Sequence, residues 1–281
     1  MGHQILSQII SELKKAKYYS ISVDSTPDIS HVDQLTFVVR YLKDCSPIER
    51  FLDVILIERH GAEYLSDTVV SFLEENGIDL QYCRGQTYDN APNMVGQCNG
   101  LQAKLEEHCT CALFVSCLVH SLNLVVGQAA GCIIEATSYF QLLQKLYSFF
   151  ASSTHHWNVL KKSLGEGTVV KRLSDTRCSA RTDAVSALHK CYPAIIDALR
   201  TMDDEPETLE TRNEARGILA ILETLDSVLL TEMWSNILVR CNETSKSLQS
   251  ESLPLDVALK LVESLLAFVE DQRDMFETCI I

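Results

Sequence analysis

The sequence predicts a mixed α/β unit in its first 132 residues and an all-helical region over residues 133–281. Three early segments alternate apolar with polar residues, which is the period-2 pattern of strands. Apolar residues in the second region recur at the three- and four-residue spacing of helices. Short polar links join the first three strands, so we expect these strands to pair in antiparallel fashion.

The elements of the first region follow one another in the order β-β-β-α-β-α-β-α. The expected strands are rich in β-branched and aromatic residues and cover 18–23, 34–42, 50–57, 80–83 and 112–115. The expected helices cover 62–75, 95–107 and 117–130, and the first of them ends at Asn76-Gly77. Three antiparallel strands that continue into β-α-β crossovers give the order of the ribonuclease H-like fold.

Composition excludes several classes of protein. No segment approaches the ~18 consecutive apolar residues of a membrane helix, and the N-terminus reads as an amphipathic helix rather than a signal peptide. Hydrophobic residues make up 46% of the chain, which is enough for a substantial core. The 11 cysteines, an odd number, favour a reducing compartment, either cytosol or nucleus.

Charge is distributed unevenly along the chain. The net charge is −14, and residues 201–281 account for −11 of it, with 17 acidic and 6 basic residues. Residues 161–190 carry a net +4. Such a segment can meet nucleic-acid phosphates or can be a solvated helix face. Its candidate nucleic-acid contacts are Lys161, Lys162, Lys171, Arg172, Arg177 and Arg181.

Two aspartates, Asp24 and Asp89, each lie where an apolar run ends. Asp24 follows the alternating segment 19–23, and Asp89 lies in a polar turn before a helix-like segment. Two carboxylates from separate elements can hold Mg²⁺ or Mn²⁺, and such metals activate water and stabilise a displaced phosphate oxygen. The alternative is that both are ordinary turn residues, because aspartate is common in turns and helix caps.

Four blocks of the sequence resemble the hAT superfamily of DNA transposases, in particular transposon-derived proteins related to zinc finger MYM-type protein 1 and DUF4371-type proteins. The blocks are YYSISVDSTPDISHVDQLTFVVRYL, RGQTYDNAPNMVGQCNGLQAKL, FVSCLVHSLNLVV and SDTRCSARTDAV, within residues 14–190. The resemblance implies an α/β ribonuclease H-like core interrupted by an all-α insertion domain. It further implies a nuclear location, DNA as a partner, protein partners and homo-oligomers built through a C-terminal region.

The resemblance gives Asp24 and Asp89 the roles of the first and second metal-binding carboxylates in DNA cleavage and strand transfer. The third acid of such enzymes is a glutamate beyond the insertion, and no acid of this chain stands in that context. Cys178 occupies the place of a tryptophan that stacks on a flipped base. We therefore expect the chain to lack catalysis. The first interpretation is therefore a transposase-derived domain that has lost its catalytic activity. The alternative is a domesticated regulatory or protein-interaction module without catalysis. An independent ribonuclease H-like nuclease is a third, weaker interpretation.

A Cys-x-x-His pair, Cys117 and His120, lies in the third block. The resemblance implies that this pair packs beside the acidic site, where it contacts DNA or supports the metal ligands. A structural zinc site is the other reading, because Cys109 and Cys111 lie just upstream and such a site needs four convergent ligands.

Overall fold

The computed structural model describes residues 2–27, 32–96, 99–165, 169–173, 178–204 and 207–279. The chain forms two compact units, and we call them the sheet unit (residues 1–121 with 249–254) and the helical unit (122–248 with 255–281). The boundary between the units falls inside helix α5 (Leu118–Gly131). The domain boundary between residues 132 and 133 that we expect from the sequence stays a prediction.

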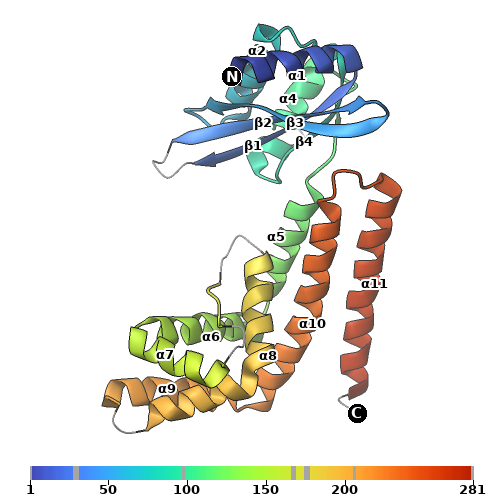
Figure 1. Cartoon of the computed structure of the whole chain (residues 1–281). Coiled ribbons are helices and arrows are strands. Elements are labelled where there is room, and N and C mark those ends of the chain that lie inside the picture. The colour runs from blue at the N-terminus through green and yellow to red at the C-terminus, as the bar shows by residue number, and fades with distance from the viewer. Residues whose placement is uncertain are drawn as a thin grey trace. The chain divides into compact units, whose positions relative to one another are not determined.

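A five-stranded mixed sheet forms the centre of the sheet unit, with strand order β3-β2-β1-β4-β5 (Figure 1). The strands are β1 (Tyr19–Pro27), β2 (Asp33–Lys43), β3 (Ser46–Leu56), β4 (Cys83–Thr87) and β5 (Leu113–Phe114). The first three strands pair in antiparallel fashion, β4 pairs in parallel with β1, and β5 pairs in parallel with β4. The predicted antiparallel trio followed by parallel strands is therefore confirmed.

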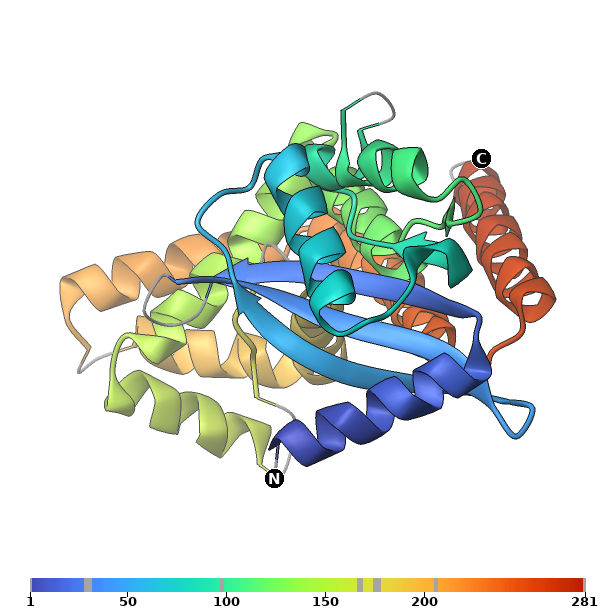
Figure 2. The ribbon, with the colours of Figure 1, turned by 90° about the horizontal axis from the view of Figure 1, so that it is seen from above.

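One face of the sheet is covered by helices α1 (Gly2–Ala16), α2 (Ala62–Glu75) and α4 (Leu101–His108) (Figures 1 and 2). Alternate residues of the central strands point to this face and are buried there. The core that results contains Ile21, Val23, Leu35, Phe37, Val39, Leu65, Val69, Leu73, Leu101 and Leu105. The rings of Phe37 and Phe72 lie 4.9 Å apart, which joins β2 to α2.

Several predicted boundaries in the sheet unit are wrong, including the start of the third strand, which begins at Ser46 and not at residue 50. Strand β1 does not end before Asp24, because its pairing with β2 continues to Pro27↔Asp33. The fourth strand begins at Cys83, since residues 80–82 form the 3₁₀ turn η1 (Leu80–Tyr82) that the Asp79 side chain caps. The helix expected over 95–107 is two helices, α3 (Pro92–Val95) and α4, and between them the backbone N–H of Gly100 donates to the carbonyl of Gly96 at 2.7 Å.

The helical unit contains six long helices besides the end of α5 among the described residues (Figure 1). They are α6 (Ile134–Ala151), α7 (Thr154–Leu164), α8 (Cys178–Asp203), α9 (Leu209–Leu222), α10 (Leu225–Leu248) and α11 (Leu255–Cys279). Their core includes Phe150, Leu188, Leu199, Ile218 and Leu238. Helix α8 bends at Cys191, two residues before Pro193, which cannot continue the backbone hydrogen bonds. The helical character predicted for this region is confirmed.

Within the described part of the chain, no single helix has both the length and the apolar character needed to cross a bilayer. Helices α5 and α6 meet that standard only when they are taken together, and the pair is bent by 101°.

Candidate functional site

The sheet brings Asp24 and Asp89 to the same place. Strands β1 and β4 pair in parallel through Ser22↔Thr87, so continuing the register by two residues sets Asp24 opposite Asp89. Side chains of a strand alternate between the two faces. Val23 and Tyr88 are buried, so their neighbours Asp24 and Asp89 point to the face opposite the helices. Asp24 is exposed and Asp89 is half-buried.

The electrostatic surroundings of Asp24 show that these groups interact. Partial desolvation raises the pKa of Asp24 above its ordinary value, and the Asp89 carboxylate raises it further. Positive charge on His120 and the backbone N–H of Ser25 act in the opposite direction and lower this pKa. Asp24 on β1, Asp89 after β4 and His120 on α5 are therefore near enough for their charges to interact.

The segment after β4 is held by hydrogen bonds to the start of α5. The Asp89 carboxylate accepts a bond from the backbone N–H of Ala91 at 3.2 Å. The Asn90 amide donates to the hydroxyl of Ser121 at 2.8 Å, and that hydroxyl donates to the carbonyl of Cys117 at 3.0 Å. Cys117 in turn donates its backbone N–H to the carbonyl of Tyr88 at 3.2 Å. These bonds fix the segment that carries Asp89 against the helix that carries His120.

A buried polar pair, Gln86 and Tyr88, supports the site from the helix-covered face. The Tyr88 hydroxyl donates to the Gln86 side-chain oxygen at 2.8 Å. The Gln86 amide donates to the carbonyls of Ala112 and Gln102, which ties β4 to β5 and to α4. Sequence reasoning missed this pair because it placed the fourth strand too early.

A close approach explains the glycine in β4. A Cβ atom on Gly85 would lie 3.1 Å from the Cβ of Ser20, the neighbouring residue on β1. This distance is shorter than most side-chain contacts, so a larger residue would push the two strands apart. Gly85 therefore preserves the pairing that aligns the two aspartates.

The donor set at the two aspartates fits a hard divalent cation. Mg²⁺ in proteins is commonly bound by one or two carboxylates, while water and substrate phosphates fill the other positions. Burial and, to a lesser extent, the Asp89 carboxylate raise the pKa of Asp24, and a bound cation would favour its charged form. Asp24 and Asp89 are the residues that would hold the metal. Its chemistry would be to activate water and to stabilise charge on phosphate oxygens.

The zinc alternative for the neighbouring cysteines is not supported. Cys109 is buried, and its thiol donates to the carbonyl of Cys83 at 3.6 Å. Cys111 is exposed at the sheet edge, while Cys117 and His120 lie at the start of α5. Across the described residues, no group of three or more His, Cys, Asp or Glu side chains could hold a metal ion.

The basic residues that the sequence singles out lie in the helical unit, and they do not all share one surface environment. Lys161 and Lys162 are exposed in the last turn of α7. Lys171 forms an ion pair with Asp183 at 2.8 Å, which offsets part of its charge. Arg172 and Arg181 line the same cavity, which has a volume of about 370 Å³. Arg177 lies outside the described residues.

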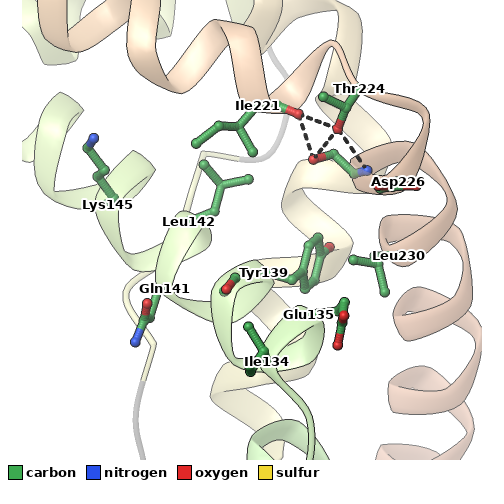
Figure 3. A pocket seen from close by; sticks show the side chains of 12 residues that line it. Ile134, Glu135, Tyr139, Gln141, Leu142, Lys145, Ile221, Thr224, Asp226 and Leu230 are labelled. Atoms are coloured by element: carbon green, nitrogen blue, oxygen red, sulfur yellow. Dashed lines mark hydrogen bonds between the residues drawn. The ribbon is translucent and has the colours of Figure 1, made fainter.

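A larger cavity of about 550 Å³ lies in the helical unit, where α6 faces α9 and α10 (Figure 3). Its wall is mostly apolar, with Ile134, Leu142, Ile221 and Leu230 among the residues that line it. One side carries a small hydrogen-bond network in which the hydroxyls of Thr224 and Ser227 both donate to the carbonyl of Ile221. None of the predicted site residues lines this cavity.

Comparison with known proteins gives two kinds of similarity. Residues 1–100 match the family model DUF4371, described as the ZMYM1/FAM200 RNase-like domain. The chain is also similar to the 52 kDa repressor of the inhibitor of the protein kinase from Mus musculus, at 20% identity over 97% of this chain. The Homo sapiens protein of the same name is 21% identical over 88% of the chain.

The chain spans 38% of the length of the mouse relative and 34% of the human one. The family match covers β1 to β4 and therefore includes Asp24, Asp89 and the pairing that aligns them. The resemblance to DUF4371-type proteins that the sequence blocks indicate is thus confirmed over residues 1–100, which match the model of this RNase-like domain.

Proposed function

We propose that this chain is a domesticated module derived from a hAT-type DNA transposase, with a regulatory role in the nucleus. The RNase-like family match and the similarity to two repressor proteins support this proposal. In it, the sheet unit is the first part of a ribonuclease H-like catalytic core, and the helical unit is the insertion domain. DNA is the proposed partner, and Lys161, Lys162, Arg172 and Arg181 are proposed phosphate contacts.

The proposal assigns Asp24 and Asp89 to a residual divalent-metal site. The observation that supports it is the parallel register of β1 and β4, which pairs Ser22 with Thr87, two residues before each aspartate. His120 and Cys117 position the segment around them. A site built from these two carboxylates would bind Mg²⁺ or Mn²⁺ weakly, with water and phosphate oxygens in the other positions.

Calorimetric titration of Mn²⁺ into the chain tests this assignment. We expect heat from one weak site in the wild type, and its loss in both Asp24→Asn and Asp89→Asn. Asp67→Asn is the matched control, because Asp67 is an exposed acid of α2 on the covered side of the sheet. Equal heats in all four proteins would show that the aspartates bind no metal.

DNA cleavage assays distinguish a regulatory module without catalysis from an active DNA-cleaving enzyme. With Mn²⁺ and a DNA duplex, we expect no strand cleavage above that of Asp89→Asn, since the proposal gives the chain a regulatory role. Cleavage by the wild type that disappears in Asp89→Asn would instead revive the enzyme reading.

A further inference from the structure

A cluster of basic and aromatic side chains lies at the end of the sheet where β1 and β4 begin, far from the aspartates. We call it the basic aromatic patch, and its members are Lys14, Lys17, Tyr18, Tyr82 and Arg84. The parallel pairing Tyr19↔Cys83 brings the residues just before β1 and around the start of β4 together. Lys14 lies in the last turn of α1, which ends immediately before the patch.

The cations and rings of the patch are in direct contact. The rings of Tyr18 and Tyr82 meet edge to face, with centroids 6.2 Å apart. The Lys17 ammonium lies 5.3 Å from the first ring and 5.2 Å from the second. The Arg84 guanidinium lies 4.5 Å from the Tyr18 centroid. It also donates to the carbonyls of Gln81 and Cys83 at 2.9 and 2.8 Å, which fixes its orientation.

The rings remain accessible to a ligand. Tyr18 is 50% exposed and Tyr82 is 38% exposed, although large aromatic residues usually bury most of their surface. Lys14, Lys17 and Tyr82 also line a cavity of about 180 Å³ beside the rings. Gly77 forms part of its wall with φ at +59°, and a Cβ there would lie 2.9 Å from the Lys14 ammonium. The Lys14 ammonium therefore lies close against Gly77 in the wall of the cavity.

The charge of the patch is unbalanced within an acidic chain. Residues 1–121 contain nine lysines and arginines, and three of them belong to the patch. In the described part of the chain, Lys14, Lys17 and Arg84 form no salt bridge. Asp79 lines the same cavity and is the acid facing these cations, but its carboxylate accepts the backbone N–H of Gln81. Lys14, Lys17 and Tyr82 thus line this cavity, while the Arg84 guanidinium lies on the neighbouring Tyr18 ring.

We propose that the basic aromatic patch binds single-stranded nucleic acid. Lys14, Lys17 and Arg84 would contact backbone phosphates, while unpaired bases would stack on Tyr18 and Tyr82. A duplex keeps its base faces covered by neighbouring pairs, so it would use the cations but not the rings. The patch is separate from the acidic site, because the six residues from Tyr18 to Asp24 span roughly 20 Å of extended strand. It requires no bound metal.

Fluorescence anisotropy with a labelled 20-nucleotide oligo-dT, in EDTA and low salt, tests the patch on the whole chain. We expect the double variant Tyr18→Leu/Tyr82→Leu to bind about tenfold more weakly. Lys17→Gln/Arg84→Gln would bind more weakly and show a shallower dependence of affinity on salt. Lys104→Gln, at a partly buried lysine of α4 paired with Glu107, is the control for loss of a positive charge outside the patch and would bind as the wild type does. Circular dichroism confirms that each variant is folded.

Three outcomes would overturn this assignment. One is wild-type affinity in the double tyrosine variant. Another is loss of binding only in Lys161→Gln/Lys162→Gln, which would place the contact on α7 of the helical unit. The third is absence of binding by the wild type. Because no metal is present, these results are independent of the Mn²⁺ titration of Asp24 and Asp89, so the two proposals stand or fall separately.

Discussion

The two ends of the β1–β4 pair carry opposite charge, although one parallel register builds both. At the carboxyl ends of the strands, Asp24 and Asp89 repel each other, and the pKa of Asp24 is raised. At the amino ends, Lys17 and Arg84 rest on the rings of Tyr18 and Tyr82. A bound cation would therefore neutralise negative charge at the acidic end, whereas a bound anion would neutralise positive charge at the basic end.

This difference shows that strands β1 and β4 connect the two proposed binding surfaces and hold them apart. The distance between them is set by strand length and not by loops, because both surfaces begin or end on β1 and β4. A change that disturbs β4 is expected to damage both ends, while a change at one end is expected to leave the other intact. The predictions below use this contrast, beginning with the largest effect.

The largest effect is expected from Gln86→Ala, in the middle of β4. The substitution removes the acceptor of the Tyr88 hydroxyl and the donor to the carbonyls of Gln102 and Ala112, all in the buried interior. Buried groups left without partners cost about 1–3 kcal/mol each. We expect the free energy of unfolding in urea to fall by about 3 kcal/mol, with weaker Mn²⁺ and oligo-dT binding together.

Gln81→Ala is the control for this variant. Gln81 precedes β4, is exposed, and donates its side-chain amide to the carbonyl of His108. A surface substitution of this kind changes stability by roughly 0.5 kcal/mol or less. If Gln86→Ala proved as stable as Gln81→Ala, the buried pair would not be what holds the two ends in register.

The second test crosses the two ends. Asp24→Asn/Asp89→Asn is expected to abolish the Mn²⁺ heat while leaving oligo-dT affinity in EDTA within about twofold, which corresponds to less than ~0.5 kcal/mol. Tyr18→Leu/Tyr82→Leu is expected to do the reverse, weakening oligo-dT binding about tenfold and sparing Mn²⁺. Calorimetry and anisotropy measure the two effects. Loss of both activities in either variant would mean that the ends are one site.

The same contrast shows how far the sequence alone predicts the site. Period-2 alternation identified the three antiparallel strands. The position of two acids after apolar runs singled out Asp24 and Asp89 as metal ligands, and this assignment stays a prediction. The fourth strand was misplaced because Leu80 and Tyr82 look like strand residues, whereas the Asp79 side chain caps a 3₁₀ turn there. Local capping outweighed β propensity at this point.

The basic aromatic patch could not be predicted from local patterns. Tyr18 and Tyr82 are 64 positions apart, and only the β1–β4 register brings them within 6.2 Å. The basic segment 161–190 illustrates the reverse. Its lysines and arginines are close in sequence, yet Lys171 is engaged by Asp183. Basic residues that are close in the sequence therefore do not necessarily form one basic surface in the fold.

A smaller effect is expected from Asn90→Ala at the acidic end. This substitution removes the hydrogen bond from Asn90 to the Ser121 hydroxyl, which joins the Asp89 segment to α5. Because the bond is only partly buried, we expect a loss of about 1 kcal/mol in the free energy of unfolding. Mn²⁺ binding should weaken severalfold, with oligo-dT binding unchanged. Asn93→Ala, which loses a bond to the carbonyl of His60, is the control, and equal Mn²⁺ affinities would exclude a positioning role.

The smallest effect is a stabilisation by Asp24→Asn that depends on pH. Because the folded-state pKa of Asp24 lies above its ordinary value of 3.8, the folded chain holds this proton to higher pH than the unfolded chain does. The free energy of unfolding therefore falls as pH rises above 3.8, and the asparagine variant escapes that fall. Since Asp24 is exposed and solvent screens the pair, we expect a gain below about 1 kcal/mol at pH 7, or less than about 4 °C in Tm.

Thermal melts in EDTA should converge for the two proteins near pH 4. Added Mg²⁺ should raise the Tm of the wild type alone, since only its paired carboxylates bind the ion. An asparagine variant less stable than the wild type at pH 7 in EDTA would show that the two aspartates do not repel each other.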